Sequence, residues 1–270
     1  MRKFILPLLA VVLISFCAPV FAGVLKPVEL RCEYLPNPTV VDVLNPRLSW
    51  INEATVPQNG LSQVAYEIEV AGTPELLRAD KANFWKTGKV KSSQSTLIRY
   101  SGKALQSRDE CWWRVRVWDS RGGRSAWSEP ARWHMGLLQH TDWKALWIGA
   151  PWQGEAGVKP LSEALPHPAP LLRKQFKVQK EIKSAYLYTT GLGYFEVYCN
   201  GNKVSDDVLV PNQSLWGKRE DLHKYGIPVQ DNFTEYRVFY LCYDLTKDLK
   251  PGANALGAIL GNGFYNSASQ

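Results

Sequence analysis

The feature that most constrains this chain is a series of short segments in which apolar and polar residues alternate, separated by turn residues. Residues 64–70 alternate tyrosine, isoleucine and valine with two glutamates. Residues 111–118 place Trp113, Val115 and Val117 on one face, with two arginines between them. Because successive side chains of a strand point to opposite faces, this period predicts half-buried strands. No long segment has the helical period, so the chain is predicted to be all-β, built from small antiparallel sandwiches.

The first predicted domain covers residues 23–137 and is followed by a segment of different character. Its strands are predicted at residues 28–34, 47–51, 64–70, 96–100, 111–118 and 127–134. Residues 138–170 contain five prolines and begin with an apolar stretch at 143–149. Repeated proline interrupts both helices and sheet ladders, so residues 138–170 are predicted to be a Pro-rich linker or a long surface loop.

The second predicted domain covers residues 171–270 and is expected to be a jelly-roll (galactose-binding-like) sandwich. Its strands are predicted at residues 172–178, 185–189, 192–200, 203–210, 236–245 and 254–260. Asn200-Gly201 predicts a type I′ hairpin, because both central positions of that turn need a positive φ. These segments amount to roughly six strands, whereas a jelly roll has about eight. We therefore expect the sandwich to be incomplete and the chain to be a fragment of a longer protein.

The first 22 residues predict a secretory signal peptide. Arg2 and Lys3 precede an apolar stretch at residues 4–16, which is too short to span a bilayer. Val20-Phe21-Ala22 fits the small-x-small cleavage rule, which places the mature start at Gly23. We expect an exported bacterial protein, periplasmic or secreted, without a transmembrane segment in its mature chain.

A lipoprotein modified at Cys17 is the alternative interpretation of the same segment. Phe16 stands directly before that cysteine, where a small residue is wanted, and this argues for cleavage instead.

Charge and cysteine usage exclude several classes of function. The formal charge is +7, but the basic residues are interspersed and form no run, so nucleic acid is not an expected partner. Cys32, Cys111, Cys199 and Cys242 each lie in an apolar strand segment, where cysteine acts as a small apolar side chain. Export permits disulfides among them, and their disulfide state stays open. The four histidines and these cysteines lack the spacing of a zinc site.

The first domain resembles a fibronectin type III domain. The resemblance rests on Pro46-Arg47-Leu48-Ser49-Trp50, on residues 66–70 and 113–119, and on Gly123-Arg124-Ser125-Ala126-Trp127-Ser128. It implies that Trp50 lies in the core on the second strand. Trp113 stands where that family has its corner tyrosine, so the corner hydrogen bond is not expected here.

The whole of residues 26–270 resembles the N-terminal region of bacterial α-L-rhamnosidases. The resemblance rests on the opening segment 30–38 and on an ordered set of motifs in the second domain, which are residues 194–201, 208–211, 243–246, 249–257 and 260–265. Each motif is weak alone, and only their order makes them specific. The segment 218–234 is longer than is usual in that family.

The resemblance implies a role beside a catalytic domain and not catalysis by these residues. In that family hydrolysis of terminal α-L-rhamnosyl linkages, with inversion, belongs to a later (α/α)6 barrel. Inverting glycosidases need two carboxyls about 6.5–9.5 Å apart. No helical repeat is present in residues 1–270, so no catalytic residue is assigned. Rhamnose-containing glycans and the missing C-terminal catalytic domain are the implied partners.

Five residues are candidates for carbohydrate binding, and each also has a purely structural interpretation. Asp206 and Asp207 are adjacent carboxylates that suit a sugar hydroxyl or calcium, but a solvated hairpin end is favoured, because calcium loops show more oxygen ligands at regular spacing. Trp216 lies in the polar segment 212–234 and could stack on a sugar or cover a sandwich edge. Asn262 and Tyr265 lie in a motif that could approach the catalytic domain or form an ordinary turn.

No cofactor is implied, and calcium has no support beyond these carboxylates. Two other functions stay open from the residues alone: a complete, non-catalytic carbohydrate-binding protein, and a structural spacer that binds no sugar.

Overall fold

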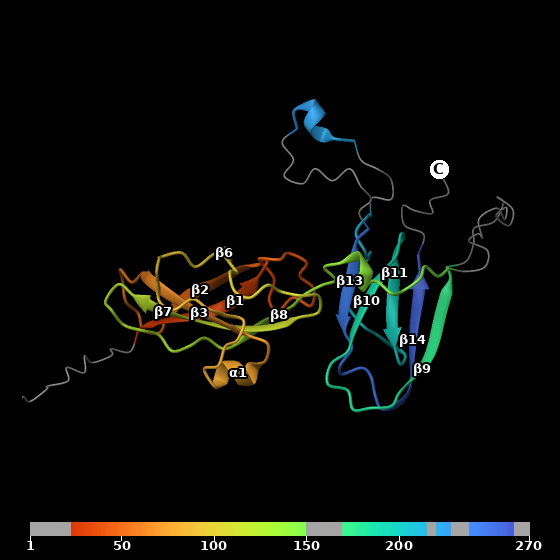
Figure 1. Ribbon diagram of the computed structural model, residues 1–270, viewed down its shortest axis with the longest axis horizontal. Coiled ribbons are helices and arrows are strands. Elements are labelled where there is room, and N and C mark those ends of the chain that lie inside the picture. Colours follow the sequence, from red (N-terminus) through yellow and green to blue (C-terminus); the bar gives the residue numbers. More distant parts are fainter. Residues whose placement is uncertain (1–22, 150–168, 215–219, 228–237, 262–270) are drawn as a thin grey trace, which may run out of the picture. The chain divides into compact units, whose positions relative to one another are not determined.

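The computed structural model describes residues 23–149, 169–214, 220–227 and 238–261 (Figure 1). Nearly all regular structure in these ranges is β-strand, which confirms the predicted fold class. The helices in the described ranges are single turns: α1 (Pro74–Arg78), η1 (His140–Asp142) and η3 (Leu222–Tyr225). None of the helices in these ranges has the length and hydrophobicity that crossing a bilayer requires.

The chain divides into two compact units, each described here by itself. The first consists of the chain up to residue 37 with residues 45–104 and 110–132, and the second of residues 38–44, 105–109 and 133–270. In this unit the Val41 amide donates to the carbonyl of His134, more than 90 residues later, and the Arg108 amide donates to the carbonyl of Met135. Within the predicted linker, Leu146, Trp147 and Ile148 are exposed, at 88%, 65% and 75% of full exposure. Residues 150–168 lie outside the described ranges.

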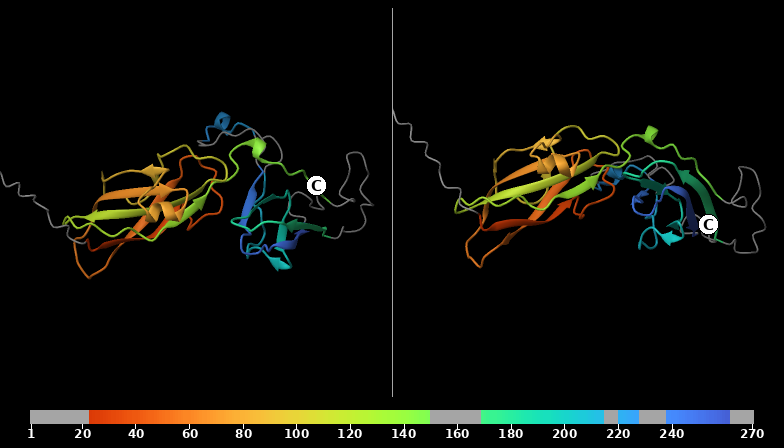
Figure 2. Two further views of the ribbon diagram at one scale, coloured as in Figure 1. Left: turned by 60° about the horizontal axis from the view of Figure 1, so that its bottom comes forward. Right: turned by 90° about the horizontal axis from the view of Figure 1, so that it is seen from below.

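Two sheets packed face to face form the first sandwich (Figure 2). One sheet has the order β1-β2-β6 and the other β4-β3-β7-β8, with β5 pairing β3. The strands are β1 (Leu25–Cys32), β2 (Arg47–Ala54), β3 (Gln63–Ala71), β4 (Trp85–Lys86), β5 (Val90–Lys91), β6 (Ile98–Arg99), β7 (Glu110–Asp119) and β8 (Ala131–His134).

The core of this sandwich is built from the alternating residues that the sequence indicates. In the β3–β7 ladder, Ile68 lies opposite Val115 and Val70 opposite Trp113, and all four side chains are fully buried. Trp50 on β2 is 2% exposed and its indole donates to the Gln63 side chain at 3.1 Å. The predicted core position of Trp50 is therefore confirmed. The two sheets meet through apolar side chains, with one buried amide to satisfy the indole.

Trp113 occupies the place of the corner tyrosine but makes no corner hydrogen bond in the described structure. Its side chain is 0% exposed, and its indole Nε1 has no hydrogen-bond partner among the described residues. The larger apolar ring contributes burial here instead of a polar contact.

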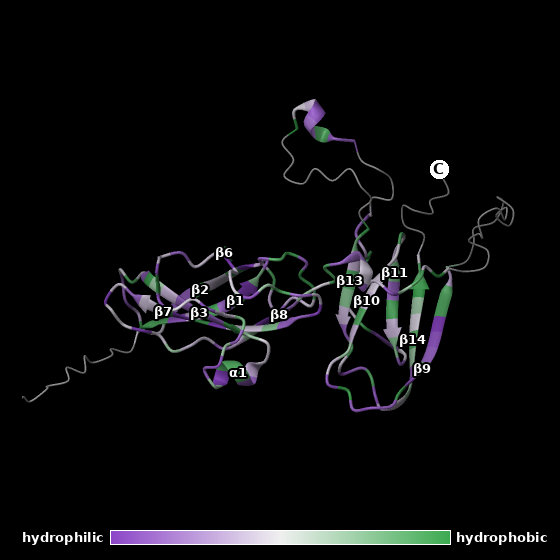
Figure 3. Ribbon diagram, in the orientation of Figure 1, coloured by the Kyte–Doolittle hydropathy of each residue, from purple (hydrophilic) through white to green (hydrophobic). Residues whose placement is uncertain are grey.

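The second unit contains two further sheets. Four strands have the order β12-β11-β14-β9, and β10 pairs with β13 as a separate ribbon (Figure 1). They are β9 (Leu171–Val178), β10 (Tyr186–Thr190), β11 (Phe195–Cys199), β12 (Asn202–Lys203), β13 (Tyr240–Asp244) and β14 (Gly252–Leu260). Phe195, Val197 and Cys199 alternate on β11 and are buried. Edge strand β9 has no buried residue, and its hydrophilic middle lies between more apolar ends (Figure 3).

The Asn200-Gly201 turn joins β11 to β12 as a two-residue hairpin. Tyr198 pairs with Lys203 and Cys199 with Asn202, and the two turn residues have φ of 51° and 91°. Both angles lie in the left-handed region that a type I′ turn requires, so this prediction is confirmed.

The predicted strand at residues 203–210 is wrong beyond Lys203. β12 ends there, and Val208 and Leu209 are about 70% exposed. Ser205 Oγ accepts a hydrogen bond from the Asp207 amide at 3.0 Å, so the side chain replaces the ladder as that amide's partner. Such local side-chain bonds compete with sheet pairing and turn the chain away from it.

Candidate functional site

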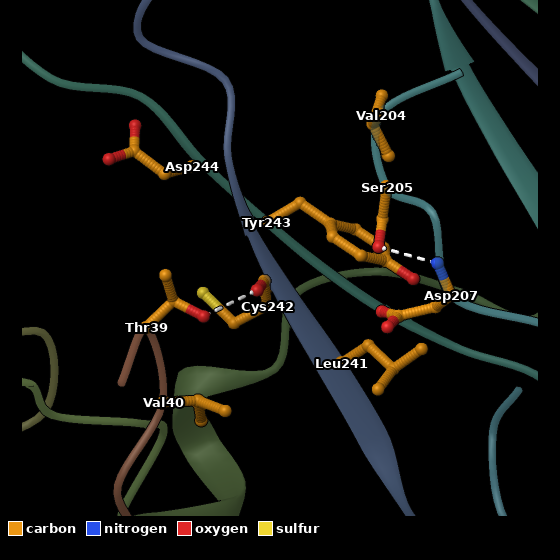
Figure 4. A pocket seen from close by; sticks show the side chains of 9 residues that line it. All are labelled: Thr39, Val40, Val204, Ser205, Asp207, Leu241, Cys242, Tyr243 and Asp244. Carbon is orange, nitrogen blue, oxygen red and sulfur yellow. Dashed lines mark hydrogen bonds between the residues drawn. The ribbon is translucent and has the colours of Figure 1, made fainter. Parts of the chain in front are cut away.

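A pocket of about 320 Å³ lies beside strand β13 in the second unit (Figure 4). Four of its lining residues are on β13 itself, which are Leu241, Cys242, Tyr243 and Asp244. Three come from the segment that follows β12, which are Val204, Ser205 and Asp207. Thr39 and Val40 complete it. All nine belong to the second unit.

Among the described residues, strand β13 pairs with β10 alone, and its other backbone edge faces the pocket. Its ladder to β10 runs from Tyr240 opposite Thr190 to Asp244 opposite Tyr186. The Thr39 hydroxyl donates to the carbonyl of Cys242 at 2.9 Å on the free edge. By strand alternation, Leu241 and Tyr243 lie on one side of this edge and Cys242 and Asp244 on the other. Within the part of the chain that the structure describes, the pocket thus lies along the edge of β13 that has no strand partner.

The segment after β12 brings a carboxylate to the pocket. Val204 still donates to the carbonyl of Val197 at 3.0 Å, which extends the hairpin by one residue. The Ser205–Asp207 turn then directs the Asp207 carboxylate toward the hydroxyl of Tyr243 (Figure 4). Failure of the predicted strand is therefore what creates this side of the site.

Burial and charge both act on the titratable groups of the pocket. Burial, with the nearby charge of Asp207, raises the pKa of Tyr243 to about 12. Burial also raises the pKa of the Cys242 thiol to about 12, with a further contribution from Asp244. Near neutral pH the phenol and the thiol both keep their protons, so Tyr243 can donate a hydrogen bond and Cys242 is not a nucleophile.

A cluster of aromatic side chains packs on the β10–β13 ribbon. His134 Nε2 lies 2.7 Å from the Tyr188 hydroxyl, and its ring stacks on Tyr186 at 3.9 Å between centroids. The Tyr240 hydroxyl accepts from the Leu137 amide at 3.0 Å. All of these residues belong to the second unit. Aromatic packing and hydrogen bonds therefore hold the ribbon that carries Tyr243 in place.

A second hollow, of about 280 Å³, lies over β9 and β14 and has a different lining. Apart from Arg173 and Tyr198, its lining residues are aliphatic or glycine, among them Leu171, Leu256 and Ile259. It offers few groups that could orient a polar ligand, so the pocket beside β13 is the better candidate site.

The predicted site residues differ in whether the structure places them at the pocket. Asp207 lines the pocket and its neighbour Asp206 does not, although both residues are exposed. Trp216, Asn262 and Tyr265 lie outside the described residues. Thr39, Tyr243 and Asp244 were not predicted as site residues. Tyr243 and Asp244 lie in the motif at 243–246, but Thr39 precedes them by about 200 positions, and no local pattern joins it to them.

No group of three or more histidine, cysteine, aspartate and glutamate side chains that could hold a metal ion occurs in the described ranges. The two carboxylates of the pocket are fewer than the six to eight oxygen ligands, roughly, that calcium takes.

Comparison with known proteins places both units in one family. Residues 27–139 match the family described as "Rha78A-like, N-terminal immunoglobulin domain", and residues 180–270 match "Alpha-L-rhamnosidase N-terminal domain". The first description agrees with a two-sheet sandwich of the kind that the fibronectin type III resemblance implies.

Full-length relatives give the same assignment. An α-L-rhamnosidase of Alteromonas sp. (strain LOR) is 37% identical over 89% of this chain and 24% of its own length. An α-L-rhamnosidase of Formosa agariphila is 36% identical over 85% of this chain and 23% of its own. The solved α-L-rhamnosidase from Dictyoglumus thermophilum superposes with a TM-score of 0.70 at 32% identity, over 89% of this chain and 25% of the other. The chain thus spans about a quarter of the length of these relatives.

Proposed function

This chain belongs to the N-terminal region of the α-L-rhamnosidase family, and we propose that it serves as the accessory, non-catalytic part of such a glycosidase. The observation that carries the proposal is the pair of family matches, in the order of the two units, together covering residues 27–139 and 180–270. The parent enzyme would hydrolyse terminal α-L-rhamnosyl linkages of glycans or glycosides.

The chemistry of the parent is proposed to lie outside residues 1–270. Inverting hydrolysis needs one carboxyl to protonate the leaving oxygen and a second to activate water. The resemblance assigns that pair to an (α/α)6 barrel, and the described residues form β-sheets and single helical turns. The two sandwiches would then position the barrel and contribute to glycan binding.

Hydrolysis of p-nitrophenyl α-L-rhamnoside tests this division of labour. We expect a protein extended through the downstream reading frame to release nitrophenol, and residues 23–270 alone to show less than about 1% of that rate. A cooperative thermal transition of residues 23–270 would verify that the inactive protein is folded. The proposal is wrong if residues 23–270 hydrolyse the glycoside at a comparable rate, or if the extended protein does not hydrolyse it at all.

Export is part of the proposal, supported by the basic start, the apolar stretch at residues 4–16 and the Val20-Phe21-Ala22 sequence. Expression in a Gram-negative host followed by mass spectrometry of the periplasmic protein should give Gly23 as the first residue. Retention of Met1, or lipid attached at Cys17, would contradict cleavage at this site.

A non-catalytic carbohydrate-binding role is the second candidate, and the pocket beside β13 favours it. The pocket combines carboxylates, hydroxyls and a tyrosine ring, which are the groups that hold sugars in proteins. The two functions are compatible, because an accessory sandwich can bind glycan for the enzyme that contains it.

A further inference from the structure

We infer that Asn59 is a site of spontaneous deamidation, where the backbone and water convert the asparagine to aspartate and isoaspartate, and that the fold protects Asn200 in the same dipeptide sequence. The inference concerns the covalent chemistry of the first sandwich and does not depend on the function proposed above. It follows from the exposure and the hydrogen bonds of the two asparagines.

Deamidation at an Asn-Gly sequence is an intramolecular reaction followed by hydrolysis. The backbone nitrogen of the glycine, after losing its proton, attacks the side-chain amide carbon of the asparagine. The bond from that carbon to the side-chain nitrogen breaks and ammonia leaves. One water molecule then opens the resulting succinimide at either carbonyl carbon, which gives aspartate or isoaspartate. Glycine favours the attack because it has no Cβ to hinder the approach to its nitrogen.

The Asn-Gly sequence occurs at residues 59–60, 200–201 and 262–263. Residues 262–263 lie outside the described ranges. The other two pairs lie in turns, and their glycines have similar left-handed conformations, with φ of 74° at Gly60 and 91° at Gly201. Because the dipeptide and the glycine conformation are alike, the surroundings of the asparagine side chain decide whether each site reacts.

The surroundings of Asn59 leave its side chain able to react. Asn59 is exposed in the loop between β2 and β3, and neither its side chain nor the Gly60 amide has a hydrogen-bond partner among the described residues. Gly60 is bonded only through its carbonyl, which accepts from the Ser120 hydroxyl at 3.4 Å. A Cβ added at Gly60 would meet nothing within 4 Å. The Asn59 side chain can therefore rotate until its amide carbon meets the Gly60 nitrogen.

The surroundings of Asn200 hold its side chain against strand β14 and the loop before it. Its Nδ2 donates to the Asp248 carbonyl and to Asn254 Oδ1, both at 2.9 Å, and its Oδ1 accepts from the Ala255 amide at 3.0 Å. Asn254 is itself buried. The Asn200 amide carbon must leave these partners before it can reach the Gly201 nitrogen. A tenfold slower reaction corresponds to only about 1.4 kcal/mol in the activation free energy, which the loss of several hydrogen bonds supplies.

The modified loop can keep the contacts that join it to the sandwich. The Ser120 amide donates to the Ser62 carbonyl at 2.9 Å, and β3 begins at the next residue, Gln63. The Asn59 side chain has no partner among the described residues to lose, and the new carboxylate is solvated. Deamidated protein should therefore accumulate in the folded state, with one additional negative charge at neutral pH.

Peptide mapping by mass spectrometry on the purified full chain tests the inference. The protein would be incubated at pH 8 and sampled over several weeks, with fragmentation to assign each deamidation to a residue and isoaspartyl methyltransferase to label isoaspartate. A parallel sample in concentrated guanidinium chloride gives the rates without the fold. Asn59→Gln is the matched control, because its longer side chain would have to close a six-membered ring. Thermal unfolding before and after incubation verifies that the protein is folded.

We expect Asn59 to deamidate at least about tenfold faster than Asn200 in the folded chain, and the two rates to lie within about threefold of each other in guanidinium chloride. N59Q should lose the isoaspartate label of the loop peptide, and both N59Q and the deamidated wild type should keep the thermal midpoint of the fresh protein. The inference is overturned if Asn59 stays intact in the folded chain, if both asparagines react equally there, or if the tenfold difference persists in guanidinium chloride. Glycoside hydrolysis enters none of these outcomes, so the site can fail while the accessory role stands.

Discussion

The contribution of Arg114 to stability depends on the buried groups that surround it. Its guanidinium lies 2.6 Å from Glu69, whose side chain is 6% exposed, and 4.3 Å from the centroid of the Trp127 ring. It also pairs with Asp80, and Lys86 is a second partner for Glu69 at 3.1 Å. Burial removes the Glu69 carboxylate from water, and the nearby cations offset the free-energy cost of its lost hydration.

We expect Arg114→Met to lower the free energy of unfolding by about 2–3 kcal/mol, because it leaves a buried carboxylate with Lys86 as its remaining cation. Arg78→Ala is the control, since Arg78 and Glu75 form an ion pair at about 70% exposure and such pairs contribute about 0.5 kcal/mol. Urea denaturation of both variants measures the difference. A loss in R114M no greater than in R78A would show that the buried pair does not stabilise the first sandwich.

Single residues also explain where local sequence reasoning failed. Thr73-Pro74-Glu75 carries the signals of a helix start, with Thr73 accepting from the Leu76 amide at 3.4 Å, yet the five-residue helix that follows is too short to show a period. Ser205 ended a strand that its apolar neighbours predicted, because one hydroxyl was enough to redirect the backbone.

At the scale of the element, the β11–β12 hairpin depends on backbone conformation more than on contacts. Gly201 has a φ of 91°, and a Cβ added there would meet nothing within 4 Å. Glycine is therefore needed at position 201 for its backbone conformation, and not because a larger side chain would clash. Gly257 on β14 is the opposite case, since its φ is ordinary and a Cβ would lie 3.7 Å from the nearest heavy atom, the Leu172 carbonyl oxygen.

We expect Gly201→Ala to destabilise the protein by about 1 kcal/mol or more, because alanine is strained at positive φ. Gly257→Ala should be neutral or slightly stabilising, since a strand glycine loses more backbone entropy on folding than alanine does. Thermal unfolding of the two variants under identical conditions compares them. Equal losses in both would mean that the hairpin tolerates the strain.

For the whole molecule, the buried phenols and thiols predict how stability depends on pH. Burial raises the pKa of Tyr243 and Cys242 to about 12, and it raises the pKa values of Cys32 and Tyr188 as well. Unfolding returns these groups to ordinary values, about 8.5 for cysteine and about 10 for tyrosine. The folded state thus holds these protons more tightly, so its advantage is complete below pH about 8.5 and is lost as pH rises toward about 12.

We expect the urea midpoint to stay level between pH 7 and 8 and to fall steadily up to pH 11, by an amount on the order of a few kcal/mol in the free energy of unfolding. Cys242→Ala should make the decline shallower, because it removes one of the groups that release a proton on unfolding. A midpoint that is the same at pH 8 and pH 11 would show that these side chains are not desolvated in solution.

What the sequence determined by itself was local and periodic. Alternation at residues 64–70 and 111–118 gave the strands and the buried faces of the first sandwich, because a period of two leaves only one way to bury the apolar set. Asn200-Gly201 located a hairpin from two residues, because few residues accept the φ values of its turn. The ordered motifs of the second unit indicated the family, although none of them identified a site.

Only the tertiary structure decided which polar residues come together. Thr39 and Asp244 are separated by about 200 residues and Asp207 lies beyond the end of β12, yet all three line one pocket beside β13. Asp206 and Asp207 are chemically identical in the sequence and both are exposed, and only the tertiary structure shows that Asp207 alone of the two lines the pocket. Such juxtapositions depend on how strands return through space, which has no local signature in the order of the residues.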